Sequence, residues 1–131
     1  MSGEQLIVYR NHTIAAVVPA YNEETLISRV IETMPDYVDR IVVVDDASKY
    51  GTISTVNGYL PRMDERLTLI QHETNQGVGG AIATGYEWCR DHEVDVAVVM
   101  AGDAQMDPAD LLDPVVSGEV DYAKGKMVIC Q

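Results

Sequence analysis

The sequence predicts an α/β protein built around a parallel β-sheet, and three observations lead to this prediction. Stretches of strand-like and helix-like character alternate along the 131 residues. Three of the strand-like stretches, residues 13–18, 40–44 and 94–100, are apolar almost throughout, as in strands that helices cover on both faces. Parallel strands are nearly always joined by right-handed crossovers, so every loop that leaves a strand for a helix should reach the same edge of the sheet.

The first half of the chain is expected to contain two strands with a helix between them. Residues 13–18 form the first strand, and Asn22 is placed to cap a helix that ends at Pro35. Residues 40–44 form the second strand. The apolar residues at helical spacing between the two strands are Leu26, Ile27, Val30, Ile31 and Met34.

The second half continues the alternation. The helix that opens at residues 77–80 should carry apolar side chains on one side, namely Ala81, Ile82, Tyr86 and Cys89. In chain order, the expected elements are a short helix over residues 53–60, a weaker strand over 67–71, the helix from 77–80, a strand over 94–100, a helix capped by Asp107 with Pro108 at its first position, and a fifth strand at 120–123.

Net charge limits the classes of partner. The chain has a formal charge of −12, and 47% of its residues are hydrophobic against 23% charged, which is typical of a globular domain. A polyanion such as DNA or RNA needs a basic surface, so no nucleic-acid partner is expected. For the same reason, a phosphate-bearing substrate would need a cation between it and the protein.

The length of the chain favours one domain over residues 1–131, and its two isolated cysteines suit a reducing cytoplasm. No apolar run approaches the roughly 20 residues needed to span a bilayer, and no signal peptide is expected. Cys89 and Cys130 are too far apart in the sequence to form a zinc motif or a disulfide framework, so both are expected to be structural or free thiols.

Polar, acidic and glycine-rich residues gather in four loops that should meet at one edge of the sheet. In open α/β sheets, ligands bind outside the carboxyl ends of the strands, where these loops lie. Each motif is weak alone, but four in order at four strand ends predict a binding site. The loops are residues 19–23, 45–48, 75–80 and 102–105.

Asp45 and Asp46 end the second strand, and each has two interpretations. A carboxylate here can close its own loop as an Asx-turn, which is as good an interpretation for Asp45 as a functional one. In the functional interpretation, the carboxylate accepts hydrogen bonds from a nucleotide base or a ribose hydroxyl.

The glycine-rich loop also has two interpretations. Its glycines can serve a tight turn and close helix packing, or they can let backbone N–H groups approach a ligand. The loop does not match the dinucleotide fingerprint, because Ile82 stands where a third glycine should follow Gly77 and Gly79. It also follows the third strand, whereas that fingerprint follows the first.

The remaining candidate site residues also have a structural and a functional interpretation. Asp103 and Gln105 offer hard oxygen ligands for Mg²⁺, although a self-bonded loop would also explain them. Tyr21 and Glu23 could pack and match a helix dipole, or they could line a site. Other residues are expected to be structural: His12, His72 and His92 on the surface or in loops, and Trp88 with Cys89 in the core.

At the positions of these loops, the sequence resembles family 2 glycosyltransferases, with the dolichyl-phosphate or polyprenyl-phosphate hexose synthases as the nearest branch. The likeness runs from about residue 14 to residue 125. The motifs that carry it are residues 17–24 (VVPAYNEE), 43–48 (VVDDAS), 75–81 (NQGVGGA) and 100–108 (MAGDAQMDP).

The resemblance implies a GT-A fold that binds a GDP- or UDP-hexose together with Mg²⁺ or Mn²⁺, and an acceptor such as a polyprenyl phosphate at the cytoplasmic face of a membrane. Asp103 and Gln105 would hold the cation. The residues implied for the nucleotide pocket are Pro19, Tyr21, Glu23, Val44 and Asp46, with Gly77 and Gly79 in the glycine loop and Ala101, Gly102, Asp103 and Gln105 along the pyrophosphate.

Two departures from the family pattern leave other functions open. Ala101 replaces the leading acid of the D-x-D motif, and residues 126–131 leave the pattern before the acceptor-binding half with its catalytic base. A donor-binding module without transferase activity is therefore the main alternative, and self-association through the exposed apolar end is also expected. A nucleotidyltransferase would need a basic glycine-rich loop after the first strand, and a Rossmann oxidoreductase would need its glycines there.

Overall fold

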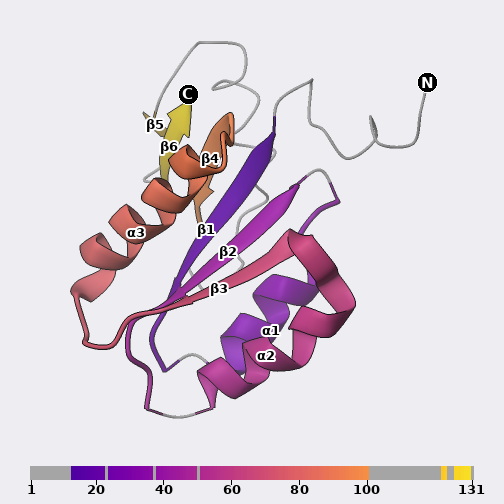
Figure 1. Ribbon diagram of the computed structural model, residues 1–131, viewed down its shortest axis with the longest axis vertical. Coiled ribbons are helices and arrows are strands. Elements are labelled where there is room, and N and C mark those ends of the chain that lie inside the picture. The colour runs from indigo at the N-terminus through magenta and orange to yellow at the C-terminus, as the bar shows by residue number, and fades with distance from the viewer. Residues whose placement is uncertain are drawn as a thin grey trace.

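The described part of the chain forms one sheet flanked by helices (Figure 1). The computed structural model describes residues 13–22, 24–36, 38–49 and 51–100, together with the backbone of two strands, 122–123 and 126–130. The strand order is β3-β2-β1-β4-β6-β5. The elements are β1 (Ile14–Ala20), α1 (Glu24–Glu32), β2 (Arg40–Asp45), α2 (Thr52–Met63), η2 (Asp64–Arg66), β3 (Leu67–Gln71), α3 (Gly77–Asp91), β4 (Val96–Val99), β5 (Tyr122–Ala123) and β6 (Lys126–Cys130).

Strands β1 to β4 pair in parallel, which confirms the predicted sheet. The observed strands begin and end within about two residues of the expected bounds. Strand β6 pairs antiparallel with β4, and β5 pairs antiparallel with β6. This antiparallel pairing was not expected from the sequence, which places only a fifth strand near β5.

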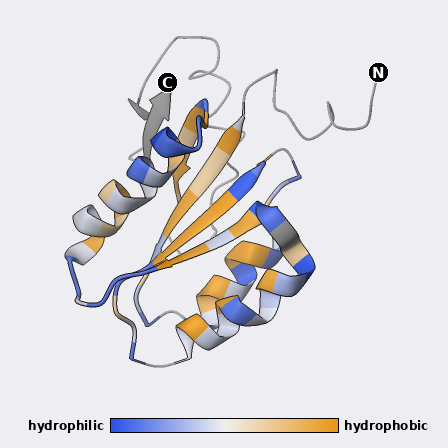
Figure 2. Ribbon diagram, in the orientation of Figure 1, coloured by the Kyte–Doolittle hydropathy of each residue, from blue (hydrophilic) through white to orange (hydrophobic). Residues whose placement is uncertain are grey.

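The sheet buries both of its faces, and this explains the unbroken apolar runs. Helices α1 and α2 pack on one face, while α3 packs on the other (Figure 1). Along β1, Ile14, Ala16 and Val18 face α1 and α2, while Ala15 and Val17 face α3. A strand buried on both sides needs no polar alternation. In Figure 2 strands β1 to β4 are correspondingly mostly orange, whereas the loop that joins β3 to α3 is blue.

Helix α2 is longer than the sequence predicted. It runs through Pro61 to Met63, although a proline cannot donate the hydrogen bond that the carbonyl of Asn57 would otherwise receive. Both Asn57 and Pro61 are exposed, so water can reach that carbonyl. The proline therefore does not end this helix, because it stands in the last turn on the solvent side.

Helix α3 approaches β1 closely at a position that only glycine fits. A Cβ atom built on Gly85 would lie 2.3 Å from Cγ1 of Val17, which is fully buried at the centre of the sheet. The expected apolar side of α3 is confirmed, since Ala81 and Cys89 are buried in the same cluster. Among the described helices, none is long and apolar enough to cross a membrane.

Candidate functional site

A small open pocket lies where the carboxyl ends of β1 and β2 meet the first turn of α3. It has a volume of about 60 Å³ and is lined by Pro19, Ala20, Tyr21, Asp46, Val78 and Ala81. Three residues that the sequence predicted for a binding site therefore line one pocket: Pro19, Tyr21 and Asp46. The expectation that the strand-to-helix loops share one edge of the sheet is confirmed for the loops that the structure describes.

The loop after β1 is tied to the loop after β2. The backbone N–H of Asn22 donates to Oγ of Ser48 at 2.8 Å, and Oδ1 of Asn22 accepts from the N–H of Lys49 at 2.9 Å. Asn22 also has a positive φ of 52°, a conformation that asparagine tolerates better than most residues. The prediction that Asn22 caps α1 is therefore wrong, because its side-chain oxygen binds the neighbouring loop instead.

Asp45 closes its own loop. Its carboxylate accepts from the N–H of Ser48 at 2.9 Å and from the Ser48 hydroxyl at 2.5 Å, and the residue is fully buried. The structural interpretation of Asp45 is confirmed. Through Ser48, this carboxylate also holds the loop that contains Asn22.

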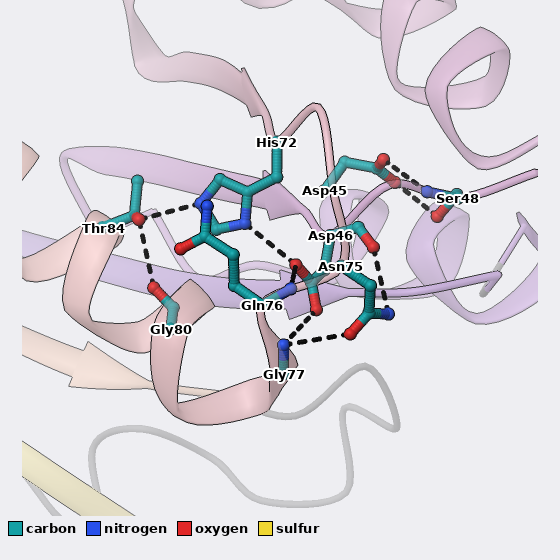
Figure 3. Close-up of polar contacts among 9 residues, drawn as sticks. All are labelled: Asp45, Asp46, Ser48, His72, Asn75, Gln76, Gly77, Gly80 and Thr84. Atoms are coloured by element: carbon teal, nitrogen blue, oxygen red, sulfur yellow. Dashed lines mark hydrogen bonds and ion pairs between the residues drawn. The ribbon is translucent and has the colours of Figure 1, made fainter.

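Asp46 binds the start of α3. Its side chain accepts from the N–H of Gln76 at 2.7 Å, from the N–H of Gly77 at 2.8 Å and from Nδ1 of His72 at 2.9 Å (Figure 3). Burial by itself would raise the pKa of Asp46, but the hydrogen bonds from Gln76, His72 and Gly77 outweigh it and hold the pKa below its ordinary value. Asp46 is therefore an ionised carboxylate at the positive end of a helix dipole, where a negative charge is stabilised.

His72 lies in the loop after β3, as the sequence predicted, but its side chain is not on the surface. Its side chain is only 7% exposed and lies between Asp46 and Thr84, with Nε2 at 2.8 Å from the Thr84 hydroxyl oxygen (Figure 3). Its backbone N–H extends the sheet by donating to the carbonyl of Asp45. The available signal was its position as the first residue after β3, at the edge where the other loops lie. His92, by contrast, is exposed as expected and stacks on Trp88.

The glycines of the loop have different roles. Gly77 has a φ of +84°, so it serves the tight turn into α3. A Cβ on Gly80 would lie 2.7 Å from Cβ of Gln76, which is too close. Gly79 is exposed, and a Cβ there would meet no described atom within 4 Å. Turn geometry and packing thus explain Gly77 and Gly80, while no such reason applies to Gly79 among the described residues.

The other predicted site residues are either in the core or outside the described residues. Val44 is fully buried in the cluster beneath α3, so its side chain does not line the pocket. Glu23 and the predicted pyrophosphate and metal residues Ala101, Gly102, Asp103 and Gln105 lie outside the described part of the chain. Within the described residues, no group of three or more His, Cys, Asp or Glu side chains could hold a metal ion.

Comparison with known proteins agrees with this arrangement. The family model described as "Glycosyl transferase family 2" matches residues 15–130. The match extends through β6, so the expectation that residues 126–131 leave the family pattern is wrong for 126–130. Strand β6 pairs with β4 within the sheet, so this segment is part of the same fold.

Two of the curated relatives have names that contain a lipid phosphate. One is the UDP-N-acetylglucosamine–dolichyl-phosphate N-acetylglucosaminyltransferase of Methanococcus voltae, 30% identical over 88% of this chain and 52% of that protein. The other is the undecaprenyl-phosphate mannosyltransferase of Micrococcus luteus, 29% identical over 75% of this chain and 41% of that protein. The chain thus spans about half the length of the curated relatives that it matches.

A solved structure shares the fold. The mannosyltransferase PcManGT from Pyrobaculum calidifontis, in complex with GDP-Man and Mn²⁺, superimposes with a TM-score of 0.66 at 30% identity, over 80% of this chain and 31% of that one. The parallel sheet, the site at its carboxyl edge and the match over residues 15–130 lead to one conclusion. The chain belongs to glycosyl transferase family 2 and has the GT-A fold.

Proposed function

We propose that this protein transfers a hexose from a nucleoside diphosphate sugar to an acceptor of the polyprenyl phosphate class. The observation that carries the proposal is the pocket formed by Pro19, Tyr21 and Asp46 at the carboxyl edge of a GT-A sheet. The names of the relatives supply the acceptor class, since two of them act on dolichyl and undecaprenyl phosphates. We further propose that the reaction takes place at the cytoplasmic face of a membrane, where such an acceptor would be reached.

The Asp46 carboxylate has one acceptor position left for a ligand. A carboxylate has about four acceptor positions, and three donors of the protein already use three of them. Because Asp46 also lines the pocket, we propose that the remaining position accepts a hydrogen bond from the nucleotide base or ribose. Tyr21, which is 43% exposed, would pack against the base, and exposed Gly79 would let the diphosphate approach the first turn of α3.

A divalent cation fits the chemistry of this donor site. Three donors already hold the Asp46 carboxylate, and its remaining acceptor position is proposed for the nucleotide, so Asp46 is a poor metal ligand. Asp103 and Gln105, beside Ala101 and Gly102, are the proposed ligands. A bound cation would neutralise the diphosphate leaving group against the protein's charge of −12. Since Ala101 stands where the family has another acid, we propose that the substrate phosphates complete the coordination.

Nucleotide binding is accordingly expected to depend on the cation. UDP or GDP should bind the 131-residue chain in the presence of Mn²⁺ or Mg²⁺, and excess EDTA should abolish measurable binding, because an unscreened diphosphate is repelled by the net charge. Isothermal titration calorimetry with and without EDTA measures this. Equal affinity in both conditions would contradict the proposed metal role, and Asp103→Ala should reproduce the EDTA result.

The transfer reaction has its own test. A radiolabelled nucleotide sugar and a polyprenyl phosphate are incubated with the chain and Mn²⁺, and lipid-linked sugar is counted. We expect donor binding to be strong and transfer to be slow in this chain alone, because no described residue is placed as a base toward an acceptor. Donor binding without any transfer, even in a longer form of the protein, would instead support a donor-binding module.

A further inference from the structure

His72, Asp46 and Thr84 form a chain of polar contacts beneath the first turn of α3. Nδ1 of His72 faces Oδ1 of Asp46, and Nε2 faces the Thr84 hydroxyl on the second turn of the helix (Figure 3). The Thr84 hydroxyl lies 3.0 Å from the carbonyl oxygen of Gly80. The contacts connect the end of β3 to the end of β2 and the start of α3, and the latter two border the pocket.

The acceptors around the imidazole fix one of its protons. Asp46 is an ionised carboxylate that only accepts, so Nδ1 of His72 must donate to it. The Thr84 hydroxyl lies within hydrogen-bond distance of both Nε2 and the carbonyl oxygen of Gly80, and a hydroxyl can donate or accept. Thr84 is therefore a partner for Nε2 whether or not that nitrogen carries a proton.

Among the described residues, Asp46 is the acidic group that contacts the imidazole. It comes from the end of β2 and contacts Nδ1, whereas α3 contributes the neutral Thr84. Glu73, the next residue in the chain, is exposed, and the carboxylate of Asp45 is bound within its own loop. The side chains of His72 and Asp46 are 7% and 5% exposed, so they form a nearly buried pair.

We propose that His72 is a positioning residue of the donor site: its Nδ1–H group fixes the Asp46 carboxylate against the first turn of α3. This rests on the proposed function, because the benefit is a preformed nucleotide pocket. Asp46 in turn orients the N–H groups of Gln76 and Gly77, so loss of the Nδ1 donor should loosen the carboxylate and the glycine loop together. Hydrogen bonds to a carboxylate are roughly twice as strong as neutral ones, and the His72 imidazole supplies one of the three that hold Asp46.

The proton on Nδ1 can be observed without any ligand. Long-range ¹H–¹⁵N spectra of the histidine rings in the 131-residue chain at pH 7 should show His72 with a protonated Nδ1. An unprotonated Nδ1 would overturn the proposal, since the ring would then have no donor for the Asp46 carboxylate.

Two substitutions separate the positions of the ring nitrogens. The amide of asparagine can take the place of Nδ1 and that of glutamine the place of Nε2, so His72→Asn keeps a donor for Asp46 while His72→Gln does not. We expect UDP or GDP, with Mg²⁺, to bind His72→Gln about tenfold or more weakly, and His72→Asn to recover most of that loss. His92→Asn is the matched control and should bind like the unsubstituted chain. Equal losses in His72→Asn and His72→Gln would overturn the positioning role.

The two kinds of measurement separate this proposal from the proposed function. If the unsubstituted chain binds no nucleotide, the proposed function fails, while the ring spectra still decide whether His72 donates to Asp46.

Discussion

Replacing Asp46 by alanine is expected to weaken both the fold and nucleotide binding. The substitution leaves the N–H groups of Gln76 and Gly77 and the Nδ1 atom of His72 without their acceptor in a nearly buried site. Such losses should reduce the free energy of unfolding by about 2–4 kcal/mol, and nucleotide affinity by roughly 1–3 kcal/mol. Urea denaturation and calorimetry with Mn²⁺ and UDP or GDP measure the two effects.

A matched acid on the surface controls for charge. The side chain of Asp91 is 63% exposed, so Asp91→Ala changes the net charge equally without removing a buried acceptor. It should leave stability within about 0.5 kcal/mol of the unsubstituted chain. If Asp46→Ala behaved like Asp91→Ala in both measurements, the carboxylate would have no part in holding α3.

Lowering the pH should reproduce part of the loss of stability expected for Asp46→Ala. The folded state lowers the pKa of Asp46, so the stabilisation is present above the ordinary carboxyl pKa of about 4 and is lost as the pH falls through the lower folded value. Asp46→Ala lacks this contribution. The difference in unfolding free energy between the two proteins should therefore shrink below about pH 4. A difference that stays constant down to about pH 2 would contradict the assignment.

Gly85→Ala should destabilise the sheet although alanine is the better helix former. The added methyl group would lie 2.3 Å from Cγ1 of Val17, at the fully buried contact between α3 and β1. Overpacking of this kind typically reduces stability by about 1–3 kcal/mol. Thermal and urea denaturation measure it, and adding Val17→Ala should recover part of the loss because the clashing atoms are removed.

A second helical glycine isolates the packing effect. Gly58 lies on the exposed side of α2, and a Cβ there would meet nothing within 4 Å. Gly58→Ala should therefore stabilise the protein by about 0.5–1 kcal/mol through helix propensity alone. A stabilising Gly85→Ala would show that α3 and β1 are not in the close contact described.

The site was predicted well where it depends on the chain direction and poorly where it depends on side-chain partners. Parallel topology brings every strand end to one edge, so Pro19, Tyr21 and Asp46 could be grouped from the sequence. The partner of His72 could not be found in this way, because Asp46 lies 26 positions away and no periodic pattern connects the two. Asn22 was misplaced for the same reason, since its partner Lys49 belongs to a different loop.

The sequence by itself determined the parallel α/β class, the order of the elements, the edge of the sheet where the pocket lies and the family. These follow from local hydrophobic pattern and from motifs that are contiguous in the chain. Only the tertiary structure decided that Asp45 closes its loop while Asp46 holds α3, that the His72 side chain is nearly buried and that Gly85 cannot carry a side chain. Each of these depends on atoms brought together across the sheet. Spacing along the chain does not encode such distances, because packing fixes them only after the elements have assembled.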